Sequence, residues 1–153
     1  LVDPRGRLLL QQRSAAKYHS PGLWANACCG HPRPGERTPA AARRRVREEL
    51  GANVRLTSGF RTSYRTELPN GFIENEVVHV LFGACPARLA PDPAEVGATE
   101  LMTLAALRRD IVRRPARYAY WLRHYLREHH AAARRGIAAT RRDAQAEPGA
   151  AAT

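Results

Sequence analysis

The segment 30–51 constrains the fold more strongly than any other part of the sequence. Residues 30–37 are rich in glycine and proline, a composition that predicts an irregular loop. Thr38 is a residue type that caps helix N-termini, and Pro39 suits the first position of a helix. Gly51 is typical of the residue that follows a helix. The pattern therefore predicts a loop, then a helix that begins at Pro39 and ends just before Gly51.

Apolar runs separated by turn residues predict several strands around this loop and helix. The predicted strands are residues 1–2, 7–13, 23–29, 54–64, 72–84 and 100–103, with turns at 3–6 and 68–71. A short helix is predicted after Leu104, and a longer one over 117–135. Because strands and helices alternate unevenly, we expect an α/β (α+β) fold in which a mixed β-sheet is flanked by helices.

The length of 153 residues is that of about one domain. From Gly136 onward the chain is dominated by Ala, Arg, Gly and Pro. We therefore expect a folded domain over 1–135 and a disordered tail over 136–153. Because Leu1 and Val2 resemble the end of a strand, we also expect that residues upstream of this chain are missing.

The net charge of +11 raises the question of a nucleic-acid partner. No nucleic-acid recognition motif is visible, and the aromatic residues are not interleaved with the basic runs, so we expect a small anionic substrate instead. No apolar run reaches the roughly 18 residues of a membrane span, which predicts no membrane insertion. The chain has three cysteines, of which Cys28 and Cys29 are adjacent, so a disulfide framework is not expected and a cytoplasmic location is favoured.

Charged residues on the predicted helix form the first chemical motif. Gly30 is followed by Glu36 after five residues and then by the block from Arg44 to Gly51, which contains Glu48 and Glu49. Arginine and glutamate four residues apart also form ordinary pairs on solvated helices, which is the simpler interpretation. The spacing resembles the Nudix box, the loop-helix signature of enzymes that handle diphosphates. One position departs from the hydrolase pattern, because an arginine, residue 45, stands where a carboxylate is expected.

Cysteine and histidine define the second motif, Cys28-Cys29-Gly30-His31. Successive side chains of an extended segment point to opposite faces, so only one of the two thiols can belong to a site. We expect His31 to share the face of Cys29. A structural zinc site is a minor alternative, because adjacent cysteines lack the spacing that wraps a tetrahedral ion.

Two carboxylates two residues apart, Glu74 and Glu76, form the third motif. In a strand they share one face and lie about 6–7 Å apart. Beside an apolar run, such a pair is costly unless a cation or a proton separates the charges. The motif therefore favours a metal-binding or catalytic role over a solvated strand edge.

These three motifs, in this order, resemble those of type 1 isopentenyl-diphosphate isomerases of the Nudix superfamily. The segments 8–13 and 20–24 agree with the same family, and the resemblance covers about residues 1–125. It implies a Nudix fold and an enzyme that interconverts isopentenyl and dimethylallyl diphosphate through a tertiary carbocation. Arg45 is part of this family's pattern, whereas Cys85 matches nothing in it.

The resemblance also implies roles for individual residues. Cys29 and Glu76 are expected to transfer the protons, while Tyr64 and Trp121 stabilise the cation through their ring faces. Arg13, Lys17 and Arg45 are expected to bind the diphosphate, and Glu49 a Mg²⁺ that bridges to it. His31, Glu74 and Glu76 are three of five expected ligands of a Mn²⁺ or Zn²⁺. The other two, both histidines, lie upstream of this chain, and His19 and His79 do not match them, so we expect weak binding of this metal.

The sequence leaves alternatives for the reaction and for the oligomeric state. A Nudix hydrolase of a nucleoside diphosphate derivative is the main alternative, against which Arg45 and the otherwise unused Cys29 argue. We expect neither a nucleic acid nor a membrane as partner. The sequence leaves the oligomeric state open, and a monomer is compatible with it.

Overall fold

The computed structural model describes residues 1–67 and 71–146. Its elements, in chain order, are β1 (Leu8–Arg13), β2 (Trp24–Asn26), α1 (Thr38–Leu50), β3 (Thr57–Glu67), β4 (Ile73–Phe82), β5 (Val96–Met102), α2 (Leu104–Arg113), a 3₁₀ turn (Pro115–Arg117), α3 (Tyr120–Glu128) and α4 (His130–Ala146). The predicted turn at 68–71 lies mostly outside the described residues. Within those residues, no helix is both long and apolar enough to cross a membrane.

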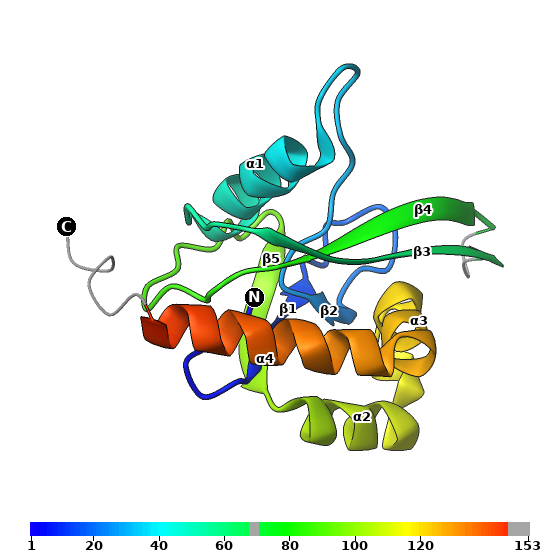
Figure 1. Ribbon diagram of the computed structural model, residues 1–153. Helices are drawn as coiled ribbons and strands as arrows, with labels where there is room; N and C mark the ends of the chain where they lie inside the picture. Colours follow the sequence, from blue (N-terminus) through cyan, green and yellow to red (C-terminus); the bar gives the residue numbers. More distant parts are fainter. Residues whose placement is uncertain (68–70, 147–153) are drawn as a thin grey trace.

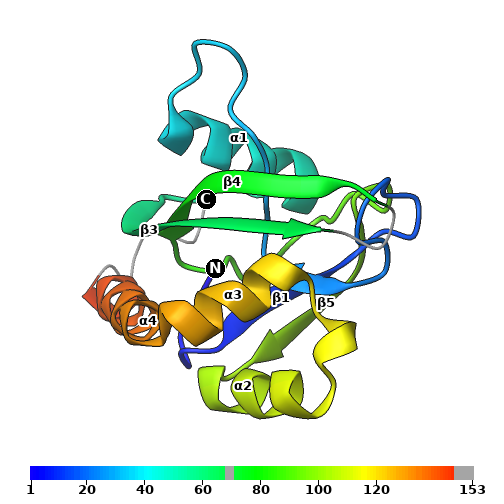
Figure 2. The same ribbon diagram turned by 90° about the vertical axis from the view of Figure 1, so that its right-hand side faces the viewer.

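The strands form two antiparallel sheets that the N-terminus connects. One sheet has the order β2-β1-β5, and the other is the long β3–β4 ribbon. Val2 bridges antiparallel to Leu8 and parallel to Ala84, so it joins the two sheets and makes the arrangement mixed, as expected. In Figures 1 and 2, α1 lies on one side of the β3–β4 ribbon, and α3 and α4 lie on the other.

Helix α1 forms where the sequence predicts it, with one difference at its start. The helix begins at Thr38, so Arg37 rather than Thr38 is the cap residue, and no side chain caps the helix. Gly51 closes it in the left-handed conformation, with φ of 64°. The predicted strands shift by a few residues, and β2 is shorter than expected because the chain leaves the strand after Asn26.

The C-terminal region differs most from the prediction. The expected helix over 117–135 is divided into α3 and α4 at His129. The expected disordered tail is wrong for residues 136–146, which continue α4, while 147–153 lie outside the described residues. Alanine and arginine are strong helix formers. Gly136 also lets α4 approach the ribbon closely, because a Cβ there would lie 2.4 Å from the ring of Phe82.

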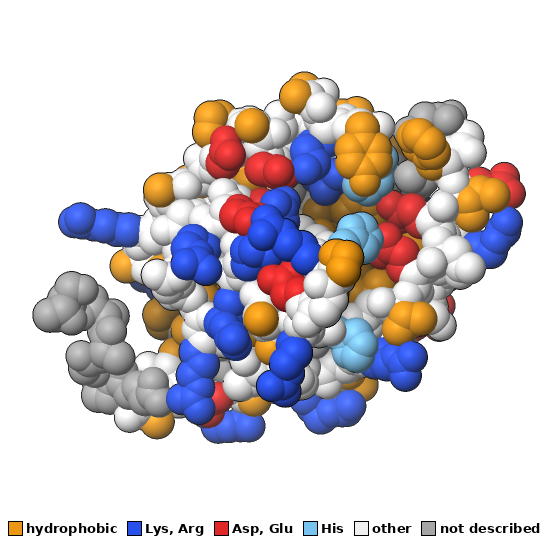
Figure 3. Space-filling model, turned by 90° about the horizontal axis from the view of Figure 1, so that it is seen from above, with side chains coloured by type: hydrophobic (Ala, Val, Ile, Leu, Met, Phe, Trp, Pro, Cys, Tyr) orange, Lys and Arg blue, Asp and Glu red, His pale blue; other side chains and the backbone are white. Residues whose placement is uncertain are grey.

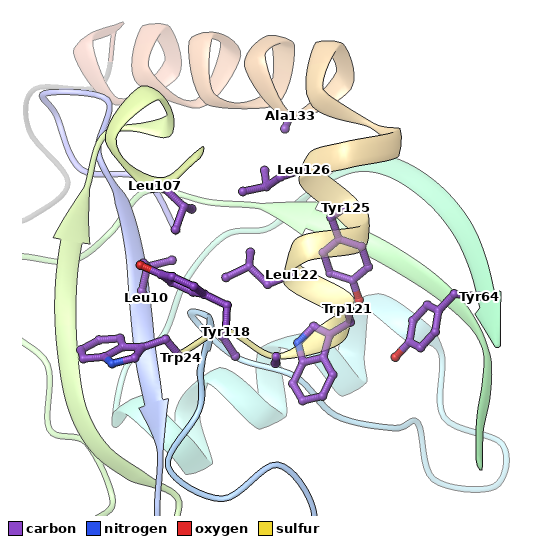
Figure 4. Close-up of a cluster of buried hydrophobic side chains, with 12 residues drawn as sticks. Leu10, Trp24, Tyr64, Leu107, Tyr118, Trp121, Leu122, Tyr125, Leu126 and Ala133 are labelled. Atoms are coloured by element: carbon purple, nitrogen blue, oxygen red, sulfur yellow. The ribbon is translucent and has the colours of Figure 1, made fainter. Parts of the chain in front are cut away.

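The core consists of two clusters of buried apolar side chains. The larger one gathers around α3, which contributes Trp121, Leu122, Tyr125 and Leu126, as Figure 4 shows. The smaller one lies between α1 and β1 and includes Leu9, Val46 and Leu50. Both clusters continue into the walls of one cavity, so the packing that stabilises the fold also positions the candidate site.

Candidate active site

A cavity of about 480 Å³ lies between α1, the β3–β4 ribbon, β1 and α3. All the site residues predicted from the sequence line it: Arg13, Lys17, Cys29, His31, Arg45, Glu49, Tyr64, Glu74, Glu76 and Trp121. Figure 3 shows a hollow with an apolar floor, edged by histidine and acidic side chains on one side and basic ones on the other. The fold therefore gathers residues that are up to 108 positions apart in the sequence, from Arg13 to Trp121.

The two adjacent thiols pack in different surroundings. Cys29 packs against the larger core cluster, and Cys28 against the smaller one. The alternation of faces that the sequence predicts is thus present. Burial raises the pKa of the Cys29 thiol to about 12, so at neutral pH the group holds its proton.

The carboxylates of Glu74 and Glu76 meet at one tyrosine. The register of the ribbon places Tyr64 opposite Glu76. The Tyr64 hydroxyl lies 3.1 Å from Oε2 of Glu74 and 3.3 Å from Oε2 of Glu76. Burial, followed by the charges of Glu76 and Glu74, raises the pKa of Tyr64, so it stays a neutral donor. Burial also raises the pKa of Glu74. The pair shares one face of the strand, as predicted.

Two histidines contact this pair of carboxylates. Nε2 of His31 lies 3.0 Å from Oε1 of Glu76. His19, which the sequence comparison with the isomerase pattern set aside, lies equally close to the other carboxylate, with Nε2 3.1 Å from Oε1 of Glu74. The ring of His19 also packs against Trp121, with the ring centroids 5.7 Å apart. His79 lies on the exposed face of β4, as expected.

The side chains of His31, Glu74 and Glu76 are of the types that bind transition metals, but they do not form a complete metal site. Imidazole nitrogen and carboxylate oxygen are ligands of Mn²⁺ and Zn²⁺. In the part of the chain that the structure describes, however, no three His, Cys, Asp or Glu side chains converge as a metal-binding group. The carboxylates of Glu74 and Glu76 are instead contacted by histidine and tyrosine.

The opposite wall of the cavity is basic. Lys17 and Arg45 both form ion pairs with Glu95, which the sequence analysis did not single out. Arg45 also pairs with Glu48 and Glu49 of its own helix. Glu49 is buried and accepts a further hydrogen bond of 2.7 Å from Nε2 of Gln11. Glu95 therefore holds the cations of a loop and of a helix in one place.

The loop that carries the cysteine–histidine motif packs closely against α1. A Cβ at Gly30 would lie 2.5 Å from Cγ of Arg45, so only glycine leaves room for that side chain. Arg44 donates to both oxygens of Glu36, at 2.9 and 2.8 Å, and to the carbonyl of His31. These bonds, led by those from Arg44, lower the pKa of Glu36 to about 2. The Glu36–Arg44 pair thus fixes the loop that carries His31 to α1.

Trp121 lines the cavity between Arg13 and the cysteine motif. Trp121 is almost completely buried, and the guanidinium of Arg13 lies 5.3 Å from the centre of its ring. Its indole Nε1 donates to Oδ1 of Asn26 at 3.1 Å, and the Cys29 thiol donates to the same oxygen at 3.2 Å. Trp121 is therefore both a core residue and part of the cavity wall.

Comparisons with known proteins identify the family. The NUDIX domain family model matches residues 1–125. "Isopentenyl-diphosphate Delta-isomerase 1" of Aromatoleum aromaticum is 48% identical over 122 residues, which cover 80% of this chain and 69% of that protein. The chain belongs to the isopentenyl-diphosphate Delta-isomerase family of Nudix proteins.

Other members of the isomerase family give the same result. "Isopentenyl-diphosphate Delta-isomerase 2" of Aromatoleum aromaticum is 46% identical, over 80% of this chain and 65% of the relative. The isomerase of Cereibacter sphaeroides strain KD131 is 47% identical, over 80% of this chain and 71% of the relative. The chain thus spans about two thirds of the length of these relatives.

Solved structures support the fold alone. A MutT Nudix hydrolase from Burkholderia pseudomallei matches with a TM-score of 0.62 at 23% identity, over 81% of this chain and 88% of that one. DR0079 from Deinococcus radiodurans matches with a TM-score of 0.61 at 22% identity, over 73% and 68% of the two chains. The predicted Nudix fold is therefore confirmed.

Three residues of this isomerase-family site were not found from the sequence: Asn26, His19 and Glu95. Asn26 ends β2 beside the cysteine motif, and His19 lies between Lys17 and Trp24, so proximity to recognised motifs was the available signal for both. Glu95 precedes β5 and gives no local signal, because its two partners come from elsewhere in the chain.

Proposed function

We propose that the protein interconverts isopentenyl diphosphate and dimethylallyl diphosphate by moving a carbon–carbon double bond. The observation that carries this proposal is a partly buried thiol, Cys29, and a carboxylate, Glu76, that line one cavity together with aromatic rings. Membership of the isomerase family supports the same reaction. One proton is added to the alkene and another is removed from the allylic carbon, so no oxidant or reductant is needed.

Cys29 and Glu76 are the proposed proton-transfer groups. One of them protonates the terminal alkene carbon, which forms a tertiary carbocation, and the other removes the allylic proton. The reaction is reversible, so its direction decides which group acts as the acid. The raised pKa of Cys29 keeps the thiol protonated at neutral pH, so Cys29 carries a proton when it enters the reaction. Tyr64 donates to Glu76 and holds that carboxylate toward the cavity.

The cation requires stabilisation without a nucleophile that would trap it. Ring faces provide this through their quadrupoles, an attraction worth about 2 kcal/mol in a desolvated site. Both rings line the cavity: Trp121 shares the acceptor Asn26 with the Cys29 thiol, and Tyr64 donates to the carboxylates. We assign them this role.

The diphosphate is proposed to bind Arg13, Lys17 and Arg45. All three line the cavity, and the last two are already held together by Glu95. A dianionic group entering here would compete with Glu95 for both cations. Arginine and lysine are the side chains that proteins use most for phosphate recognition.

Metal ions complete the proposal. We assign His31, Glu74 and Glu76 as ligands of a Mn²⁺ or Zn²⁺. The two further ligands that we expect, both histidines, are absent from this chain. Glu49 would hold a Mg²⁺, which would supply positive charge to the diphosphate. Bound divalent ions supply positive charge that organises carboxylates and neutralises phosphate oxygens.

A cytoplasmic location and a small-molecule substrate, with no nucleic-acid or membrane partner, follow from the same proposal. A monomer suffices for it, because the residues assigned to substrate all come from one chain. Comparison of two reactions tests the function: conversion of isopentenyl to dimethylallyl diphosphate, and phosphate release from nucleoside diphosphates. We expect the first and not the second. Phosphate release without isomerisation would establish the hydrolase alternative.

A further inference from the structure

The side-chain amide of Asn26 joins three parts of the cavity wall. Its Oδ1 accepts hydrogen bonds from Nε1 of Trp121 at 3.1 Å and from Sγ of Cys29 at 3.2 Å. Its Nδ2 donates to the carbonyl of Cys28 at 2.8 Å. Asn26 is the last residue of β2, the cysteines lie in the loop that follows, and Trp121 lies in the first turn of α3. One side chain therefore connects a strand, a loop and a helix.

The partners determine which way the amide points. An indole N–H can only donate a hydrogen bond, and a backbone carbonyl can only accept one. Oδ1 must therefore face Trp121, and Nδ2 must face Cys28. One lone pair of Oδ1 is used by the indole, which leaves the other for the Cys29 thiol. The strand pairing of Asn26 with Leu10 fixes the backbone from which the amide projects.

We propose that Asn26 is a positioning residue that holds the Cys29 thiol and the Trp121 ring in one fixed arrangement. The inference rests on the proposed function, in which the thiol moves a proton and the ring faces the cation that results. Both groups must face the same substrate carbons. Because both donate to Oδ1 of Asn26, their positions relative to each other are fixed. Displacement of a reacting group by about 1 Å can lower a rate about 10²-fold.

Replacement of the amide by an apolar side chain of similar size tests the kinetic consequence. We expect Asn26→Leu to lower kcat about 10²-fold and to change KM less than about threefold, because the diphosphate ligands lie elsewhere. Gln12→Leu is the matched control: Gln12 lies in the adjacent strand, and its amide donates only to the carbonyl of Gly22, at 3.0 Å. We expect both constants of this control to stay within about threefold of the original protein. Retained kcat in Asn26→Leu, or an equal loss in Gln12→Leu, would overturn the inference.

A nuclear magnetic resonance experiment tests the same inference without any turnover. The indole N–H signal of Trp121, assigned through Trp121→Phe, reports on its acceptor. We expect Cys29→Ala to shift this signal when Asn26 is present, because the thiol and the indole share one oxygen. The shift should vanish in the Asn26→Leu background, and Cys28→Ala should not produce it.

The two experiments separate failure of the inference from failure of the proposed function. Coupling between thiol and indole that needs Asn26 supports the positioning role even if isopentenyl diphosphate is not turned over, and in that case only the proposed reaction is wrong. The inference is overturned, whatever the activity, if Cys29→Ala leaves the indole N–H signal of Trp121 unchanged. It is also overturned if Cys29→Ala still shifts this signal in the Asn26→Leu background.

Discussion

The two adjacent cysteines offer a sharp test of the account, because they are chemically identical and differ only in where they point. Cys29 lines the larger core cluster beside Trp121, whereas Cys28 packs against the smaller cluster beneath α1. We predict that Cys29→Ala abolishes most of the isomerase activity and that Cys28→Ala leaves kcat nearly unchanged. The two changes remove the same atoms from neighbouring positions.

The expected magnitudes come from the two roles. A general acid or base contributes about 10²–10⁴-fold, which at 1.36 kcal/mol per tenfold corresponds to about 3–5 kcal/mol of barrier. Loss of the partly buried Cys28 sulfur removes a methyl-sized group, which costs about 1 kcal/mol of folding free energy. In a protein of this size that lowers Tm by about 2–4 °C. Cys28→Ala should therefore lose stability while it keeps its activity.

Turnover of isopentenyl diphosphate, followed by product analysis, measures the activity, and thermal unfolding measures the stability. Circular dichroism of both variants should be that of the original protein, which controls for misfolding. Equal loss of kcat in the two variants would show that the directions of the two cysteine side chains have been misassigned. An active Cys29→Ala variant would refute the proton-transfer role of the thiol.

Two further predictions concern residues that line the cavity, and a third concerns Asp110 of α2. At saturating Mn²⁺ or Zn²⁺, we expect the kcat of Glu76→Gln to stay about 10²–10⁴-fold below that of the original protein, whereas the kcat of Glu74→Gln partly recovers, because only Glu76 must exchange a proton. Titration of each variant with the metal measures this recovery. Equal recovery of both variants would contradict the prediction. Lys17→Ala should raise KM about tenfold with a smaller change in kcat, since it removes a ligand of the diphosphate; an unchanged KM would exclude that contact. Hydrogen bonding from Tyr118, followed by that from Arg114, lowers the pKa of Asp110 from 3.8 to about 2. A lowered folded-state pKa stabilises the protein above pH 4, and this stabilisation is lost as the pH falls through about 2. Asp110→Asn should therefore lower Tm at pH 6 but not at pH 2. An equal difference in Tm at both pH values would show that the ionised Asp110 does not stabilise the fold.

Local patterns predicted the parts of the site that depend on neighbouring residues. The cap at Gly51 and the proline at position 39 were sufficient to place α1 within one residue. Alternation along an extended segment separated the two thiols and put Glu74 and Glu76 on one face. These inferences rest on backbone geometry that does not depend on the rest of the fold.

Contacts between distant segments were not predictable in the same way. Pairing of Tyr64 with Glu76 depends on the register of β3 and β4, which the strand sequences alone do not fix. The approach of His19 to Glu74 depends on how a loop folds over the ribbon. The helical continuation past residue 136 was missed because composition suggested disorder, whereas packing against Phe82 stabilises the helix.

Incorporation of solvent deuterium tests the central claim most directly. In heavy water, proton addition to the alkene and removal from the allylic carbon should introduce deuterium into both isopentenyl and dimethylallyl diphosphate, with the diphosphate intact. The account predicts deuterated isomers and no released phosphate. Phosphate release with undeuterated substrate, or isomerisation that leaves solvent deuterium out of the product, would contradict it.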